Sequence, residues 1–377
     1  MSITVKKVES KKDLKSFVKF PFKIFKENKY WVPQLTMDEL EIFNRKKNPA
    51  YDSADSRLFL AYRDNEIVGR VAAINSIVAN EKYKTKNLRF GWFDSINDQD
   101  VANALLNAVE DWGREIGLKT LTGPHGFNDL DPEGMLIEGF DKLPTIAVYY
   151  NYPYYKELME NFGFEKEIDY IEFRADIPKE GEIPEKLLNI AEKIKERTKL
   201  RIIKFKSKKE LINVWASQVF EVLEEAFEEI YGSVPLSKIQ VDYYIKKYFT
   251  FVEKDLIKVV VNEDDKVVGF IIALPSLSKA FQKAKGNLLP FGWFHLLRGL
   301  KQRETLDFYL AGIKKSYQGR GLGLLMILEI AKAAREMGFK SVESNPELEN
   351  NKKIHGQWKY FKHEQHKRRR IFKKNIK

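Results

Sequence analysis

The segment from Gln318 to Gly323, Gln-Gly-Arg-Gly-Leu-Gly, constrains this chain more than any other part of it. It lies between an apolar stretch, residues 305–313, that is typical of a strand, and a helical pattern that begins near Leu322. Three glycines in five residues allow a tight turn and leave backbone N–H groups uncovered. The helix that follows adds its positive dipole end and its unpaired first-turn donors. The segment therefore predicts an anion site that a diphosphate would fit, with Arg320 adding positive charge.

Two other phosphate-binding turns do not fit this spacing. A nucleotide P-loop needs Gly-x-x-x-x-Gly-Lys-Ser/Thr, and no Lys-Ser or Lys-Thr pair follows these glycines. A dinucleotide-binding turn needs Gly-x-Gly-x-x-Gly, and here the third glycine comes too early. A glycine turn without a ligand is the remaining alternative. It is disfavoured because the helix after the turn is apolar all round at its start, which predicts burial against a sheet, and stops cleanly at Gly338.

The spacing Gln-x-x-Gly-x-Gly resembles the coenzyme A diphosphate loop of the GNAT superfamily of N-acetyltransferases, and residues 307–338 resemble that family's central motif. The resemblance implies an α/β (mixed α+β) fold in which a central mixed, mostly antiparallel sheet is flanked by helices. It also implies acetyl-CoA as cosubstrate, an amine as acceptor, and a strand before the loop that bonds the pantetheine arm through its backbone. The cofactor-binding residues that it implies are Ala311, Gly312, Ile313, Gln318, Gly319, Arg320, Gly321, Leu322, Gly323 and Asn351.

Length and a faint internal repeat both predict two domains. A chain of 377 residues is too long for one ordinary core. Residues 66–74 parallel residues 266–274, and the end of a later helix repeats as well, after an insertion at residues 276–303. This arrangement resembles the tandem acyltransferases of the superfamily. We expect a degenerate N-terminal GNAT-like domain over residues 1–175, a linker and connecting helix over 176–198, and a C-terminal GNAT domain with the acyl-CoA loop over 199–377.

The first half does not repeat the glycine loop. Its equivalent region, residues 91–100, has no glycine cluster and carries three aspartates. Because these carboxylates would repel a diphosphate, we expect only the C-terminal half to bind the cofactor.

The general acid of the family is where this sequence departs from the pattern. The resemblance implies a Tyr seven residues after an Asn such as Asn351, but Trp358 stands there, and its indole cannot protonate a thiolate. Tyr360 lies two residues further, rotated by about 200° on a helix, and is the remaining candidate for the acid. Asp307 and Glu343, on neighbouring predicted strands, are candidates for a base that relays the proton through water. An ordinary surface position is the alternative for both carboxylates.

Composition excludes several classes of site. The chain has no cysteine, which rules out disulfides, thiolate metal sites and cysteine nucleophiles. The spacing of His355, His363 and His366 matches no metal motif, and the acidic loop at residues 129–134 lacks the glutamate that closes a calcium loop, so we expect no metal. There is no long apolar run and no secretion signal, so we expect a cytoplasmic enzyme without a transmembrane segment.

Positive charge leaves more than one partner open. The formal net charge of +11 suits an anionic ligand such as coenzyme A, and would also suit nucleic acid or an anionic membrane surface. The basic tail from Lys362 onward has few aromatic stacking partners, so we expect a solvated final strand and extension there, with nucleic acid disfavoured. The insertion at residues 276–303 combines aromatic residues with flanking cations. It suits an acceptor lid, a membrane-surface contact or plain packing over the sheet.

The leading interpretation is an acyl-CoA-dependent N-acyltransferase that moves an acetyl group from acetyl-CoA to an amine. The alternative is a non-catalytic acyl-CoA sensor or a nucleic-acid-associated protein that keeps the loop and lacks the acid. Aminoacyl transfer from tRNA is disfavoured because it does not need the diphosphate loop. The acceptor, the acyl length and the oligomeric state stay open at this point.

Overall fold

The computed structural model describes residues 2–248 and 252–376, and the chain divides into two compact units. Unit 1 comprises Met1–Ile171, Ser278–Leu296 and His366–Lys377, and unit 2 comprises Glu172–Leu277 and Leu297–Gln365. The sequence-based boundaries assign two of these segments, 278–296 and 366–377, to the C-terminal domain. Their contacts group them with unit 1 instead, because the final strand pairs inside the unit 1 sheet.

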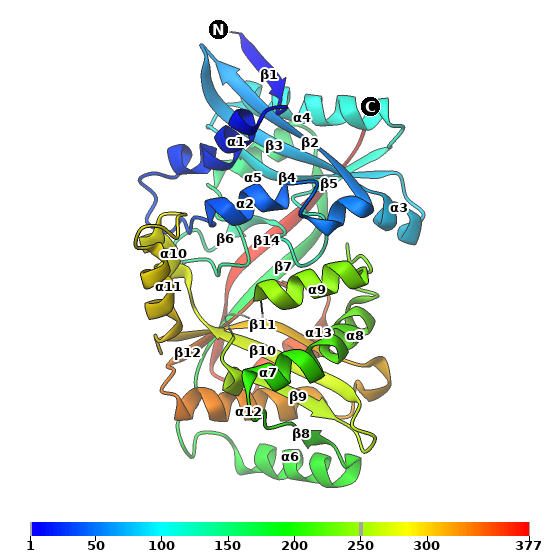
Figure 1. Ribbon diagram of the computed structural model, residues 1–377, viewed down its shortest axis with the longest axis vertical. Helices are drawn as coiled ribbons and strands as arrows, with labels where there is room; N and C mark the ends of the chain where they lie inside the picture. The colour runs from blue at the N-terminus through cyan, green and yellow to red at the C-terminus, as the bar shows by residue number, and fades with distance from the viewer. Residues whose placement is uncertain (1, 249–251, 377) are drawn as a thin grey trace. The chain divides into compact units, whose positions relative to one another are not determined.

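The sheet of unit 1 is mixed and mostly antiparallel. Only β4 and β5 run parallel among its neighbouring pairs within the described residues, with Asn87 opposite Thr120. Its strands, in spatial order, are β1 (Ile3–Lys7), β2 (Ala54–Arg63), β3 (Glu66–Ser76), β4 (Asn87–Ser95), β5 (Thr120–Gly123) and the unit 1 part of β14 (His363–Asn375) (Figure 1). A further short strand, β6 (Met135–Glu138), also pairs with β14. The other edge of β14 is paired with β7 (Glu165–Asp176).

Helices cover both faces of this sheet. Val71 and Ala73 of β3 pack in one cluster with α4 (Gln99–Glu115), whereas Ala72 and Ile74 pack in another with α1 (Lys11–Ile24) and α2 (Thr36–Ile42). Successive side chains of a strand point to opposite faces, so two covered faces explain why β3 is buried at every position from Val68 to Ile74. The remaining helices of the unit are α3 (Ile77–Tyr83), α5 (Tyr154–Asn161) and α10 (Ser278–Ala284), and α11 (Gly292–Leu300) begins in it.

The sheet of unit 2 repeats this plan. Its strands follow the order β7, β12 (Ser341–Ser344), β11 (Thr305–Ile313), β10 (Val267–Pro275), β9 (Ile257–Val261) and β8 (Arg201–Ile202), and β11 with β12 is its parallel pair. A short strand, β13 (Glu347–Leu348), pairs with β7. The helices of unit 2 are α6 (Glu185–Thr198), α7 (Lys208–Glu210), α8 (Ala216–Phe227), α9 (Lys238–Tyr248), α12 (Leu322–Glu336) and α13 (Lys352–Trp358). Both units thus have the predicted fold class.

Matching glycines support the internal repeat. A Cβ atom added to Gly69 of β3 would lie 2.7 Å from Cδ1 of Leu105, and one added to Gly269 of β10 would lie 3.0 Å from Cδ2 of Leu322. In each unit the strand glycine therefore makes room for a leucine of the helix that follows the next strand, α4 or α12.

The basic tail is an interior strand, and the expectation of a solvated one is wrong. Lys367 and Arg369 of β14 are buried, as are Ile371 and Phe372. Lys367 Nζ donates to the backbone oxygen of Leu143 (3.3 Å), and β14 lies between β5 and β7, so alternate side chains enter the core of unit 1. A terminal segment is expected to be exposed only when it does not pair with strands of a sheet.

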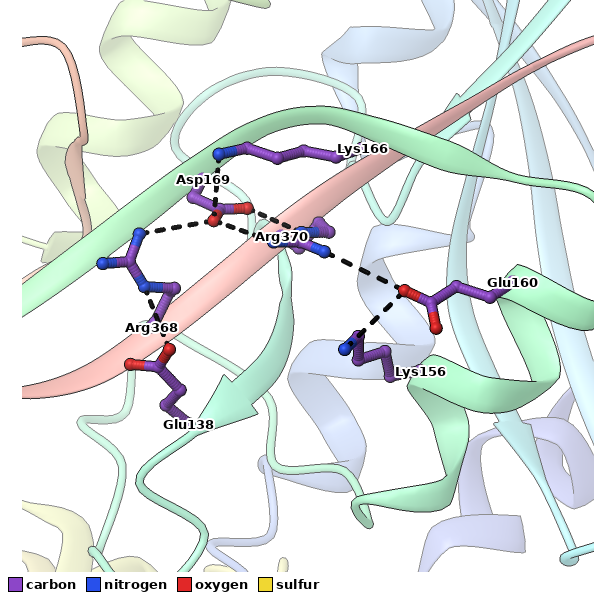
Figure 2. A network of polar contacts seen from close by, with 7 residues as sticks. All are labelled: Glu138, Lys156, Glu160, Lys166, Asp169, Arg368 and Arg370. Carbon is purple, nitrogen blue, oxygen red and sulfur yellow. Dashed lines mark hydrogen bonds and ion pairs between the residues drawn. The ribbon is translucent and has the colours of Figure 1, made fainter.

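The outward-facing cations of β14 are held by carboxylates of the same unit. Figure 2 shows Asp169 at the centre of this network. Arg370 donates to it through Nε (2.8 Å), Arg368 lies 3.3 Å away and Lys166 lies 3.2 Å away. Burial alone would raise the pKa of Asp169, but the hydrogen bond and charge of Arg370, aided by Lys166, outweigh it, and the pKa lies below its ordinary value.

Replacing Asp169 with asparagine is expected to destabilise the protein by about 3–5 kcal/mol at pH 7, because the change leaves neighbouring cations without their shared carboxylate. Since the folded-state pKa is lowered, the stabilisation by Asp169 is present above the unfolded-state pKa and is lost as pH falls through the folded-state value. Denaturant unfolding of both proteins at pH 7 and at pH 3 measures this. Glu167→Gln, which removes a carboxylate from the more exposed Lys373 pair, is the control. Equal stabilities at pH 7 would contradict the prediction.

Candidate active site

The strands β11 and β12 part at one point of unit 2, and the candidate site lies there. They run in parallel register from Thr305 opposite Ser341 to Phe308 opposite Ser344. Asn345 closes the pair: its N–H donates to the Phe308 oxygen (3.2 Å) and its Nδ2 to the Tyr309 oxygen (3.0 Å). Beyond Asn345, β11 continues beside β10, whereas the segment that follows β12 turns away into β13. In the described part of the chain, the rest of β11 has no strand along its other edge.

This edge contains the residues Ala311, Gly312 and Ile313, which were predicted to contact the cofactor. Gly312 has a packing reason of its own, because a Cβ there would lie 2.8 Å from the Phe270 ring and 3.3 Å from Ala226 of α8. The β-bulge lies further back, where the register shifts between Ile272 and Ala273 and no residue of β10 lies directly opposite Tyr309. The backbone edge, rather than a missing side chain at Gly312, is therefore what this strand offers to a ligand.

The glycine loop ends in an uncapped helix. Gly321 is the N-cap of α12, with φ of 85°, and no side chain bonds the first turn. The first backbone bond of the helix runs from the Leu325 N–H to the Gly321 oxygen (3.2 Å). Across the described residues, the N–H groups from Gly319 to Leu324 have no acceptor within the protein. Gln318 Nε2 donates to the Ile313 oxygen (3.2 Å) and so ties this row of free donors to the end of β11.

The corresponding helix of unit 1 is capped by its own carboxylate. Asp98 precedes α4 and accepts from the N–H groups of Asp100 (2.9 Å) and Val101 (3.3 Å). Arg63 donates to its second oxygen (2.6 Å), and this hydrogen bond is the main reason that the pKa of Asp98 lies below its ordinary value. An anion already occupies this helix end, which supports the expectation that only the second half binds the cofactor.

The surroundings of the glycine loop differ from one glycine to the next. A Cβ on Gly321 would lie 2.3 Å from Cδ1 of Ile194 in α6, whereas one on Gly319, where φ is 73°, would meet no atom within 4 Å. A Cβ on Gly323 would lie 2.8 Å from the side-chain amide of Gln357 in α13. Arg320 lies over the Tyr317 ring, 5.4 Å from its centre. Gly319 is thus the glycine that faces open space.

A partly buried carboxylate that the sequence did not indicate lies near the parting strands. Glu347 of β13 accepts from Nε1 of Trp358 (3.1 and 3.3 Å to its two oxygens), and Nε2 of His355 lies 3.8 Å from it. Trp358 packs between the rings of Phe173 (5.5 Å) and Phe308 (5.9 Å). The group therefore lies beside Phe308, the last residue of β11 that pairs with β12.

Desolvation controls the charge of this carboxylate. Burial raises the pKa of Glu347 to about 8, and the hydrogen bonds from Trp358 and Ser344 oppose this without cancelling it. Burial also lowers the pKa of His355, so the histidine stays neutral beside it. A carboxylate that titrates near neutral pH next to an open strand edge has the properties of a general base. The sequence around Glu347 does not indicate a functional residue, because its hydrogen-bond partner Trp358 lies at the end of α13, eleven residues later.

Comparison with known proteins identifies the family. The acetyltransferase (GNAT) family profile matches residues 217–356, which include β11, the glycine loop and α12. A solved tandem GNAT protein from the clavulanic acid biosynthesis pathway superposes with a TM-score of 0.57 at 9% identity, covering 100% of this chain and 99% of that one. The chain therefore contains a GNAT domain, which the family profile places at residues 217–356. It has the tandem two-domain arrangement, with the family match in the second half.

Two curated proteins match this GNAT chain along nearly its whole length. Protein YghO of Escherichia coli is 27% identical over 376 residues, which is 97% of this chain and 94% of that protein. A bacterial ceramide synthase of Caulobacter vibrioides is 27% identical over 358 residues, which is 93% of this chain and 91% of that protein.

The structure brings two of the three catalytic residues predicted from the sequence together and leaves the third apart. Asp307 and Glu343 are directly opposite in the parallel pair and both are buried, so neither is the surface carboxylate of the alternative interpretation. Tyr360 follows the end of α13 and is exposed. Asn351 caps α13, with its side chain accepting from the Ile354 N–H (3.3 Å). These assignments, and those of the cofactor residues, stay predictions.

Proposed function

We propose that this GNAT protein is an acyl-CoA-dependent N-acyltransferase whose cosubstrate binds to unit 2. The observation that carries the proposal is the uncapped end of α12 beside the parted strands, in contrast to the capped end of α4. The free N–H groups from Gly319 to Leu324 would hold the diphosphate, and Arg320 would add charge. The open edge of β11 from Leu310 to Ile313 would bond the pantetheine arm, as a neighbouring strand would.

We assign Glu347 as the base that accepts the proton of the acceptor amine. The amine nitrogen forms a bond to the acyl carbon, the carbon–sulfur bond breaks, and the thiolate leaves with a proton taken from solvent or from a nearby acid. Trp358 holds the carboxylate through its indole N–H and does not supply that proton. A pKa of about 8 suits the role, because the group is then a stronger base than an ordinary glutamate.

Acetyl is the acyl group implied by the resemblance to N-acetyltransferases, and a fatty acyl group is the second candidate. One relative is named a ceramide synthase, and a ceramide is a fatty acyl amide of a long-chain amino alcohol. The second candidate therefore combines a long-chain acyl-CoA with a lipid amine.

Release of free thiol from acyl-CoA tests the proposal. We expect release that depends on an added amine, with acetyl-CoA and palmitoyl-CoA each tried against short amines and a long-chain amino alcohol. Omitting the amine is the control for hydrolysis. Tight binding of acyl-CoA with no amine-dependent release for any pair would support the acyl-CoA sensor instead and overturn the assignment.

A further inference from the structure

The insertion at residues 276–303, of which 278–296 belong to unit 1, carries a group of exposed apolar side chains on an anchored backbone. Its first helix, α10, is anchored to the body of the unit: Ser278 donates to the Pro144 oxygen (2.7 Å), and Gln282 donates to the oxygens of Lys29 (2.8 Å) and Trp31 (3.0 Å). The Gly286 oxygen after the helix accepts from the Thr36 N–H (2.8 Å). The loop that follows therefore starts from a firm base.

The tip of this insertion exposes large apolar side chains. We call Leu289, Phe291, Trp293 and Phe294 the apolar knob, and their exposed fractions are 79%, 71%, 49% and 50%. Three of the four are aromatic. A soluble surface seldom exposes adjacent large side chains of this kind without a partner, and plain packing over the sheet, one of the sequence-based alternatives, does not account for them.

Backbone bonds hold the apolar knob in one shape. The Trp293 N–H donates to the Leu288 oxygen (2.8 Å), and its indole Nε1 donates to the Pro290 oxygen (2.9 Å). A Cβ on Gly292 would lie only 1.8 Å from the Asn287 oxygen, so this tight closure requires glycine. The aromatic side chains of the apolar knob are therefore held in place before any partner binds.

The charge carried by the insertion itself has one sign. Residues 276–303 contain no aspartate or glutamate, and Lys283 and Lys285 beside the apolar knob are exposed. The chain as a whole carries a formal net charge of +11. Aromatic rings next to exposed cations are the combination that enters the headgroup region of an anionic bilayer.

We propose that the apolar knob docks this protein onto the surface of an anionic membrane, with its rings at headgroup level and the two lysines on the lipid phosphates. A second copy of the chain fits this surface less well, because symmetric pairing would bring the same lysines together without a carboxylate between them. No helix among the described residues is long and apolar enough to cross a bilayer, so the contact is one with the surface.

Vesicle sedimentation of the full chain tests this. With vesicles of phosphatidylcholine and phosphatidylglycerol at low salt, we expect binding that weakens as salt is added and is much weaker for phosphatidylcholine alone. The triple variant Phe291→Ser, Trp293→Ser, Phe294→Ser is expected to lower the partition coefficient by about ten-fold or more. The double variant Lys283→Glu, Lys285→Glu is expected to lower it on anionic vesicles and to have little effect on neutral ones.

Matched controls change similar residues elsewhere. Ile77→Ser with Ile239→Ser removes exposed apolar side chains, and Lys186→Glu with Lys193→Glu reverses exposed charges, and both are expected to bind as the unaltered protein does. Anionic vesicles should also shift tryptophan emission to the blue, less so in Trp293→Phe. No binding at low salt, equal binding by the triple variant, or an unaltered protein that dimerises through the apolar knob without binding vesicles would each overturn the proposal.

Discussion

Replacing Glu347 with glutamine is expected to lower kcat by about 100-fold or more while leaving the affinity for acyl-CoA unchanged, because the change removes the proton acceptor and nothing that holds the cosubstrate. Glutamine has the shape of glutamate, and its amide oxygen can still accept from the Trp358 indole N–H. Steady-state rates with an acceptor found by thiol release, together with calorimetric affinities, separate the two effects.

The pH profile gives this prediction its sharper form. Since the pKa of Glu347 is raised to about 8, kcat/KM of the unaltered protein should rise with pH up to about 8, as the carboxylate loses its proton. Glu347→Gln should lack this rise. Tyr360→Phe should keep it and cost little, since Tyr360 is an exposed residue beyond the end of α13. A large loss of turnover in Tyr360→Phe with a small one in Glu347→Gln would transfer the role to the tyrosine.

Stability distinguishes a catalytic role for Glu347 from a structural one. A carboxyl group whose folded-state pKa is raised stabilises the fold least when it is ionised. Its contribution to stability is therefore fully present below about pH 4.5 and is lost as the pH rises through about 8. Glu347→Gln is therefore expected to match the unaltered protein near pH 4.5 and to be more stable than it at pH 8–9. An inactive variant that is also less stable at pH 8–9 would mean that the glutamate serves the fold.

Removing His366–Lys377 is expected to prevent unit 1 from folding. The deletion takes away a strand paired with β5, β6 and β7, with buried Ile371 and Phe372, and leaves Asp169 without its two arginines. Such a loss exceeds the whole stability of a typical domain, about 5–15 kcal/mol. The sequence alone favours the opposite outcome, a dispensable tail.

Circular dichroism and limited proteolysis of the truncated chain measure this effect. Lys373→Gln, which changes an exposed side chain of β14 and keeps the strand, is the control and should melt close to the unaltered protein. A truncated chain that melts at the temperature of the full chain would show that β14 is not part of the unit 1 core.

The fold and the glycine loop could be predicted because their signals are local. The spacing from Gln318 to Gly323 and the apolar strands on either side are read within one window of sequence, and the repeat around Gly69 and Gly269 adds a second copy. The burial of β14 could not be predicted, because it depends on pairing with strands more than two hundred residues earlier in the chain. The polar composition of this segment predicts exposure to solvent, whereas its position inside the sheet buries it.

Glu347 shows why a catalytic group is harder to find than a fold. Its pKa is raised by burial, and the hydrogen bond from Trp358, at the end of α13, lowers the pKa without cancelling that effect. The family pattern has a tyrosine at the position of that tryptophan, and its absence from the sequence suggests the loss of an acid. In the structure the same tryptophan is the partner of a carboxylate, and only the fold brings the two together.

Calorimetric titration of coenzyme A into a matched set of loop variants tests the central claim, that the free end of α12 holds the diphosphate. Gly319 faces open space at a positive φ, which asparagine and aspartate both tolerate, so Gly319→Asn and Gly319→Asp differ chiefly by one charge. Gly338→Asp places the same charge at the other end of α12, at a similar φ and also in open space. We expect Gly319→Asp to raise the Kd for coenzyme A by about ten-fold or more over that of Gly319→Asn, and Gly338→Asp to leave it unchanged. Equal Kd values for Gly319→Asp and Gly319→Asn in folded proteins would contradict it.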